Sequence, residues 1–177
     1  LTTRICHVKA LVTVGERRER SAPGFTKDVM RWVMVPGAAG KRLPLMFERE
    51  NALRAEAAKS KLNAIEPGSD RRVGFVTSGP AYMHVRESFR DAPVLKLGFS
   101  CPLPFDLVCE FSKQCDQLVV VEEVEPLIET EIKAQGIAAI GKDILPRSGE
   151  LSPNVLRPAI ARLLGEPVPE MATVKPM

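Results

Sequence analysis

The chain has few of the residues that build metal centres and nucleophilic active sites. Its 177 residues include two histidines and four cysteines, and no cysteines are paired at Cys-x-x-Cys spacing. GxSxG, HExxH and GxGxxG motifs are absent as well. We therefore expect buried free thiols in a reducing compartment, the cytoplasm, and neither a metal site nor a catalytic residue within this chain. The four cysteines are Cys6, Cys101, Cys109 and Cys115.

Long apolar runs and an excess of one charge are also missing. No stretch approaches the roughly 20 apolar residues that cross a bilayer, and no apolar leader opens the chain. A formal net charge of +3 is too small to indicate a nucleic-acid surface. The sequence thus favours a globular protein with neither a membrane nor a nucleic acid as its partner.

The chain is rich instead in the strand-and-helix pattern of an α/β domain. Residues 118–121 form an unbroken aliphatic run, typical of a strand buried on both faces of a parallel sheet. Pro126 suits the first turn of a helix, Glu129 precedes Lys133 by four residues, and Gly136 suits a left-handed cap. Similar signals predict strands at 73–77, 94–99 and 137–140 and helices that start near residues 80, 104 and 153.

We expect residues 71–166 to form a three-layer α/β/α domain with a mostly parallel sheet and right-handed crossovers. Residues 1–70 are expected to be an extended and helical appendage, with a docking helix from about residue 44 to 59 and a linker at 61–70. Residues 167–177 are predicted to be an exit linker. Because the chain starts in mid-pattern, we also expect it to be part of a longer polypeptide.

Three local features carry smaller predictions. Residues 31–35 have strand-like composition but end at Pro36, which allows an edge strand at most. Residues 37–42 contain two glycines and a lysine, but at the wrong spacing for a phosphate loop. Pro158 lies within the last helical pattern, so a kink or a fresh helical start is expected there.

Ligands of open α/β sheets bind beyond the carboxyl ends of the strands. At these ends Ser78 and Gly79 could hold an anion through backbone N–H groups, and Glu122, Glu123 and Glu125 could supply an acid and a base. The simpler interpretation is that Ser78 caps its own helix and that the glutamates form a solvated strand end. We keep Ser78, Gly79 and Glu122 as weak anion-binding or interface candidates.

The two histidines, His7 and His84, are expected to be surface or packed residues and not metal ligands, because no partner residues stand near them in a ligand pattern.

Three segments carry a family resemblance: VGFVTSGPAY (73–82), LVVVEEVEPLIETEI (118–132) and GKDILPRSGELSPNVLRPAIARLLG (141–165). They closely resemble the large (alpha) subunits of indolepyruvate ferredoxin oxidoreductases, within the 2-oxoacid:ferredoxin oxidoreductases. The resemblance covers nearly the whole chain. It identifies residues 72–165 as similar to the transketolase C-terminal domain, and residues 1–7 (LTTRICH) as similar to the end of a preceding thiamine-binding domain.

The resemblance implies a mixed five-stranded sheet with helices on both faces. Four strands are accounted for above, so the fifth is expected from residues 32–35 or another part of the appendage.

The resemblance also implies an enzyme that uses thiamine diphosphate with magnesium and 4Fe-4S clusters to oxidise an aryl pyruvate. In such an enzyme, the electrons released from the aryl pyruvate pass to ferredoxin, and the acyl group passes to coenzyme A. The Gly-Asp-Gly motif and the cysteine clusters of such enzymes are absent from this chain, so no catalytic residue is carried over. The implied role is an internal structural domain.

The implied partners are other domains of the same subunit, a smaller second subunit and ferredoxin, in a dimeric assembly. Two alternatives remain open: a stand-alone binding module for an anionic ligand such as coenzyme A, and an independent enzyme that uses Glu122 and Glu123.

Overall fold

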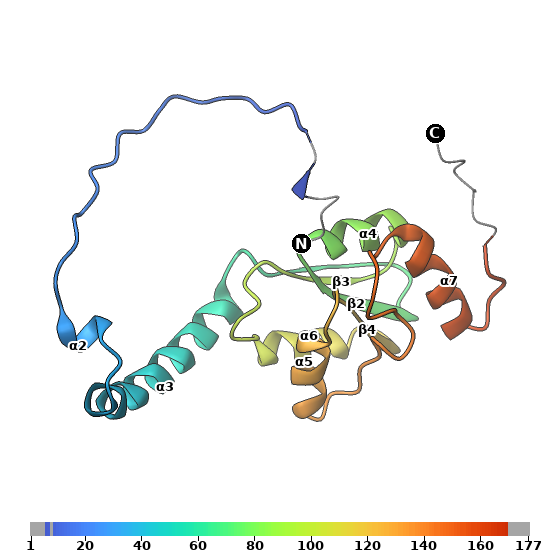
Figure 1. Cartoon of the computed structure of the whole chain (residues 1–177). Coiled ribbons are helices and arrows are strands. Elements are labelled where there is room, and N and C mark those ends of the chain that lie inside the picture. Colours follow the sequence, from blue (N-terminus) through green and yellow to red (C-terminus); the bar gives the residue numbers. More distant parts are fainter. Residues whose placement is uncertain (1–5, 8, 170–177) are drawn as a thin grey trace. The chain divides into compact units, whose positions relative to one another are not determined.

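The computed structural model describes residues 6–7 and 9–169, which form two compact units divided between Ala52 and Leu53 (Figure 1). Most of the predicted thiamine-domain end at residues 1–7, and most of the exit linker at 167–177, lie outside the described residues. The predicted domain boundaries at 70/71 and 166/167 stay predictions.

The larger unit is built around a four-stranded sheet in the order β1-β3-β2-β4. Strands β2, β3 and β4 are parallel, and β1 runs antiparallel to β3 at the edge. The bounds are β1 Ala64–Glu66, β2 Val73–Ser78, β3 Val94–Leu97 and β4 Gln117–Val121. The predicted strand at 137–140 is reduced to one parallel bridge between Ile140 and Val119, beside β4. The sheet is therefore mixed and mostly parallel, as predicted.

Helices cover both faces of this sheet, which gives the three predicted layers (Figure 1). Helices α4 (Pro80–Ser88) and α7 (Pro153–Leu163) pack on one face, and α5 (Phe105–Ser112) and α6 (Leu127–Ala134) on the other. Two separate apolar cores result, one on each side of the sheet.

The position of β4 between the two cores explains why polar and apolar residues do not alternate along it. Val119 and Val121 face the core beneath α4 and α7, whereas Leu118 and Val120 face the core beneath α5 and α6. Because successive strand side chains point to opposite faces, a strand covered on both sides needs an unbroken apolar run. All four residues are buried, which confirms the prediction of a strand covered on both faces. Its predicted central position is wrong, because β4 ends the four-stranded order and only the Ile140 bridge lies beyond it.

Residues 61–70, predicted as a linker, contain β1 and so belong to the sheet. The linker prediction is wrong because the three-residue strand is too short to give a periodic signal beside Pro67 and Gly68. This edge strand brings the hydrogen-bonded strands to four, and the Ile140 bridge adds one further contact beyond β4. Residues 32–35, the other candidate for a further strand, do not join the sheet.

The smaller unit contains α2 (Val29–Trp32) and most of α3 (Pro36–Lys59). Helix α2 replaces the edge strand considered there, because Asp28 caps it by accepting the N–H of Arg31 at 3.1 Å. Helix α3 begins at Pro36 and passes through Pro44, earlier than predicted. Residues 37–42 are therefore its first turns, which rules out a phosphate loop.

The predicted helix features of the larger unit are confirmed at two glycine caps and differ at Pro158 and Ser152. Gly136 and Gly165 adopt the predicted left-handed conformation after α6 and α7, with φ of 76° and 68°. Helix α7 runs through Pro158 without the fresh start that we considered, and Ser152 precedes it without a side-chain capping bond.

Among the described residues, no helix combines the length and apolar character needed to cross a membrane.

Candidate functional site

The carboxyl ends of β2 and β4 form the switch point of the sheet. The two strands are neighbours, and Thr77 pairs with Val121, so Ser78 and Glu122 leave the sheet at the same level. The chain then enters α4 on one face after β2 and α6 on the opposite face after β4. Open α/β sheets bind ligands at such a point. The structure thus gathers Ser78, Gly79 and Glu122 in one region.

Glu122 is buried and acts as the cap of α6. Its two carboxylate oxygens accept the N–H groups of Ile128 and Glu129, each at 2.9 Å, and its exposed fraction is 7%. Burial raises the pKa of Glu122, although the two N–H donors act in the opposite direction. The solvated-end interpretation is therefore wrong for Glu122, because its carboxylate takes the place that a bound anion takes at other helix starts.

Glu129 is a second buried carboxylate, with 4% of its surface exposed. It accepts hydrogen bonds from Lys133 Nζ at 2.6 Å and from the backbone N–H of Lys142 at 2.8 Å. The hydrogen bond to Glu129 raises the pKa of Lys133. The predicted pairing of Glu129 with Lys133 is confirmed, but no local pattern indicates that Glu129 is buried.

Lys142 completes this network from the segment that follows the Ile140 bridge. Its Nζ donates to the backbone oxygens of Glu122 at 2.5 Å and Pro146 at 3.2 Å. Burial lowers the pKa of Lys142, against the attraction of nearby glutamates. Glu122, Glu129 and Lys142 thus form their hydrogen bonds within their own unit, mostly to backbone groups, which is the arrangement of a structural network.

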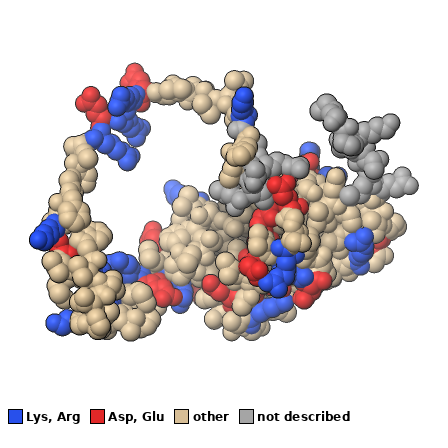
Figure 2. Space-filling model, in the orientation of Figure 1, with Lys and Arg blue, Asp and Glu red and all other residues tan. Residues whose placement is uncertain are grey.

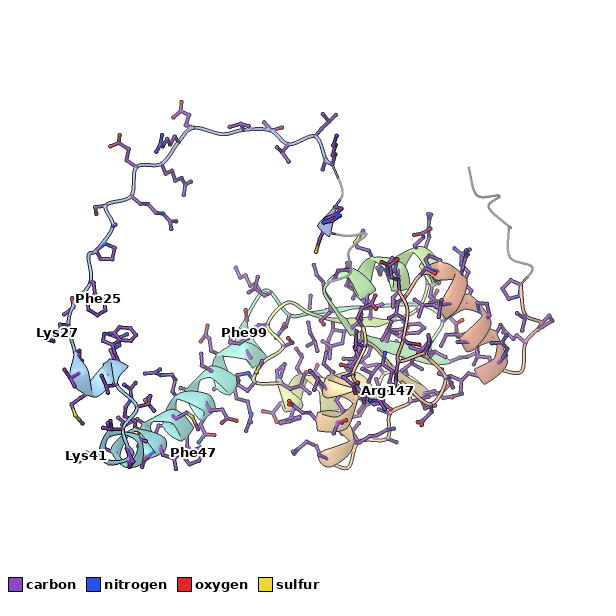
Figure 3. All side chains as sticks on the ribbon, viewed as in Figure 1. Phe25, Lys27, Lys41, Phe47, Phe99 and Arg147 are labelled. Atoms are coloured by element: carbon purple, nitrogen blue, oxygen red, sulfur yellow. The ribbon has the colours of Figure 1, made fainter. Side chains whose placement is uncertain are left out.

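The turn between β4 and α6, residues 122–126, is held by two further side chains. Glu123 accepts the N–H of Leu151 at 3.3 Å, and Glu125 pairs with Arg147 at 2.5 Å. Arg147 lies in the segment that follows the Ile140 bridge (Figure 3). Between the two glutamates, Val124 has a φ of 60°, a left-handed conformation that is rare for a β-branched residue.

Ser78 and Gly79 offer little to an anion. Ser78 is the last residue of β2, and Gly79, with φ of 56°, is the N-cap of α4 without a side-chain capping bond. The prediction that Ser78 caps α4 is therefore wrong. Pro80 has no N–H, and the N–H of Tyr82 already bonds to the Gly79 carbonyl at 3.2 Å, so few donors face outward.

The donor set does not fit the metal groups that the family resemblance implies. Within residues 6–7 and 9–169, no three His, Cys, Asp or Glu side chains lie together in a way that could hold a metal ion. His84 is half-buried on α4, and His7 is exposed. The four cysteines are free, as predicted, but the prediction that they are buried is wrong, because Cys6 and Cys101 are exposed and the other two are only partly buried. Figure 2 shows acidic and basic side chains mixed over the visible face of the larger unit, without a broad field of either sign.

Comparison with family models gives no match. The chain is 38% identical over 180 residues to the indolepyruvate oxidoreductase subunit IorA of Methanothermobacter thermautotrophicus, covering 94% of this chain and 29% of the relative. It is 34% identical over 185 residues to the IorA subunit of Thermococcus kodakarensis, covering 95% and 29% respectively. The chain thus spans less than a third of the length of these relatives.

A solved structure extends the comparison to the fold. The 2-oxoglutarate:ferredoxin oxidoreductase from Magnetococcus marinus, determined with 2-oxoglutarate, coenzyme A and succinyl-CoA bound, matches with a TM-score of 0.54 and 17% identity. The match covers 75% of this chain and 24% of that one, and it supports the α/β fold alone. The IorA relatives confirm the predicted resemblance: over nearly its whole length, this chain is similar to one segment of these indolepyruvate oxidoreductase subunits.

Proposed function

We propose that this chain is an internal structural domain of an indolepyruvate:ferredoxin oxidoreductase. The observation that carries the proposal is the match of 94% of the chain to IorA, combined with a switch point whose helix start is filled by the chain's own Glu122 carboxylate. A ligand-binding α/β domain keeps that region open. Here the buried network of Glu122, Glu129 and Lys142 stabilises the turns instead.

The chemistry of the enzyme belongs, in this proposal, to its other parts. The magnesium and 4Fe-4S clusters of the family need metal-ligand sets that the described residues do not bring together. Thiamine diphosphate supplies the electron sink for oxidative decarboxylation of an aryl pyruvate, with ferredoxin receiving the electrons and coenzyme A the acyl group. We assign no step of that reaction to a residue of this chain.

The role of the chain is to pack against neighbouring domains of the same subunit. The smaller unit supports this role, because many of its large apolar side chains are exposed, including Trp32, Met34, Leu45, Met46 and Phe47. Phe47 and Lys41 lie on α3 (Figure 3). Exposed apolar surface of this kind is typical of a protein interface. A second, smaller subunit, ferredoxin and a dimeric assembly complete the proposal, and the four free thiols suit a cytoplasmic enzyme.

Isothermal titration calorimetry tests the proposal on the chain itself. Thiamine diphosphate with magnesium, coenzyme A and indolepyruvate are each titrated into the purified chain, and we expect no saturable heat from any of them. A saturable coenzyme A isotherm that disappears in a Gly79→Val variant contradicts the structural role and favours the anion-binding module.

A substitution in the complete enzyme tests the same proposal from the other side. Glu122→Gln is expected to lower the thermal unfolding temperature while leaving the KM for indolepyruvate unchanged below that temperature. The reason is that one of the two N–H acceptors at the start of α6 is lost, whereas the proposal gives Glu122 no contact with substrate. Turnover abolished in a variant that remains folded contradicts the proposal and favours an enzyme that uses Glu122.

A further inference from the structure

The turn after β4 exposes two large apolar side chains in a region where most side chains are engaged with their own unit. Val124 is 56% exposed and Leu127, the first residue of α6, is 71% exposed. They are three residues apart, so their Cα atoms lie within about 11 Å of each other. We call Val124 and Leu127 the apolar tip.

The backbone conformation of Val124 in the tip is unfavourable for a valine. A φ of 60° suits glycine or asparagine, whereas the Cβ and two methyl groups of Val124 crowd the backbone there. A valine at this position therefore costs conformational energy in the folded chain and also exposes apolar surface. Strained residues of this kind concentrate at functional contacts.

The surroundings fix the tip in place. On one side the Glu122 carboxylate caps α6, and on the other Glu123 accepts the N–H of Leu151. Lys142 Nζ holds the Glu122 carbonyl at 2.5 Å. A contact made by a turn that is already ordered loses little conformational entropy on binding, which favours a binding role for the two side chains at its end.

The charges beside the tip are balanced. Glu125 and Arg147 form an ion pair with each other, and both side chains are more than half exposed. The tip therefore presents apolar side chains beside a neutralised polar rim, the arrangement found at the centre of protein interfaces. Its occupant needs an apolar pocket and no strong charge of either sign.

We infer that the apolar tip inserts into an apolar pocket on another domain of the same polypeptide; the inference rests on the proposed function. The IorA relatives are more than three times as long as the stretch that matches this chain, so the same subunit contains much additional surface. The tip lies at the carboxyl edge of the sheet, and its insertion fixes that edge against the neighbouring domain.

Photocrosslinking in the full-length subunit tests the occupant. Benzoylphenylalanine is placed at Leu127 and, as the control, at Met83, which is 63% exposed on α4 across the sheet. We expect crosslinks from position 127 to a peptide of the same subunit outside the present 177 residues, at least five-fold more abundant than from position 83. Equal yields, or crosslinks from position 127 only to a second copy or another subunit, overturn the inference.

The Val124→Gly variant supplies a second measurement that separates a binding role from a folding role. Glycine relieves the strained φ, so the unfolding temperature of the 177-residue chain should stay unchanged or rise. In the full-length subunit, the same variant should lose the Leu127 crosslink at least three-fold. A lower unfolding temperature of the chain, or an undiminished crosslink, overturns the inference.

Ferredoxin-dependent oxidation of indolepyruvate by the unmodified enzyme is measured separately. Its absence contradicts the proposed function. Its presence together with equal crosslinking from the two positions contradicts only the role of the tip.

Discussion

Asn63 binds both backbone groups of Phe99: its Oδ1 accepts the N–H at 2.8 Å, and its Nδ2 donates to the carbonyl at 2.9 Å. The same side chain accepts the N–H of Gly98 at 2.9 Å and donates to the carbonyl of Ala57 at 2.9 Å. One buried amide therefore ties the last turn of α3 to the loop after β3, immediately before β1 begins.

Replacing Asn63 by alanine should be strongly destabilising. The change removes four hydrogen bonds and leaves buried backbone groups without partners, each contributing about 0.5–1.5 kcal/mol. We expect a loss of about 2–4 kcal/mol in the free energy of unfolding, measured by urea denaturation of the chain. Asn154→Ala, at an exposed position of α7, is the control and should change it by less than about 0.5 kcal/mol. Equal effects of the two substitutions contradict the role of Asn63.

Gly141→Ala tests the network around Glu129. A Cβ at position 141 would lie 2.3 Å from Glu129 Oε2, so the buried carboxylate must move and weaken its bonds to Lys133 and Lys142. We expect a loss of about 1–3 kcal/mol in unfolding free energy and a lower melting temperature by circular dichroism.

The control for Gly141 is Gly40→Ala. No atom lies within 4 Å of a Cβ at Gly40, which sits inside α3, so alanine there should increase helix content. A Gly141→Ala protein as stable as the unmodified chain would show that Glu129 is loosely held.

Gly74 and Cys115 should show a non-additive effect on stability. A Cβ at Gly74, within β2, would lie 2.5 Å from Cys115 Sγ. Gly74→Ala alone is therefore expected to cost about 1–3 kcal/mol, and the added change Cys115→Ala should recover at least about 0.5 kcal/mol of that loss. Urea denaturation of the four proteins of the double-mutant cycle measures the coupling. Strictly additive effects would contradict the close approach.

Tyr82 provides a pH-dependent test, because it is the only tyrosine in the chain. Its hydroxyl donates to Glu66 Oε1 at 2.7 Å, and this bond raises the pKa of Tyr82 above its ordinary value of 10.0. A group with a raised folded-state pKa contributes stability below its unfolded pKa, and that stability is lost as the pH rises through the folded pKa. We expect the absorbance at 295 nm to titrate with a midpoint above 10.

The Glu66→Gln variant should move that midpoint down, since the carboxylate acceptor becomes a neutral amide. The control is Glu87→Gln, which changes an exposed glutamate on α4, the helix that contains Tyr82. It should leave the midpoint of the Tyr82 titration unchanged. Identical midpoints in all three proteins would show that Glu66 does not control the ionisation of Tyr82.

The elements whose signal is local could be predicted from the residues alone. The aliphatic run at 118–121 predicted a strand buried on both faces, because such burial leaves no position for a polar residue. Gly136 and Gly165 marked two helix ends, because the left-handed conformation favours glycine. The family resemblance followed from the same segments.

The features that depend on hydrogen-bond partners outside a local pattern appear only in the folded chain. Strand β1 is too short for a periodic signal and is held through Asn63 to a loop more than thirty residues later. Glu122 and Glu129 look like surface residues in the sequence, as most glutamates are, and they are buried because backbone N–H groups of α6 and Lys142 converge on them. A local pattern cannot specify such partners, because only the packed sheet brings them within hydrogen-bonding distance.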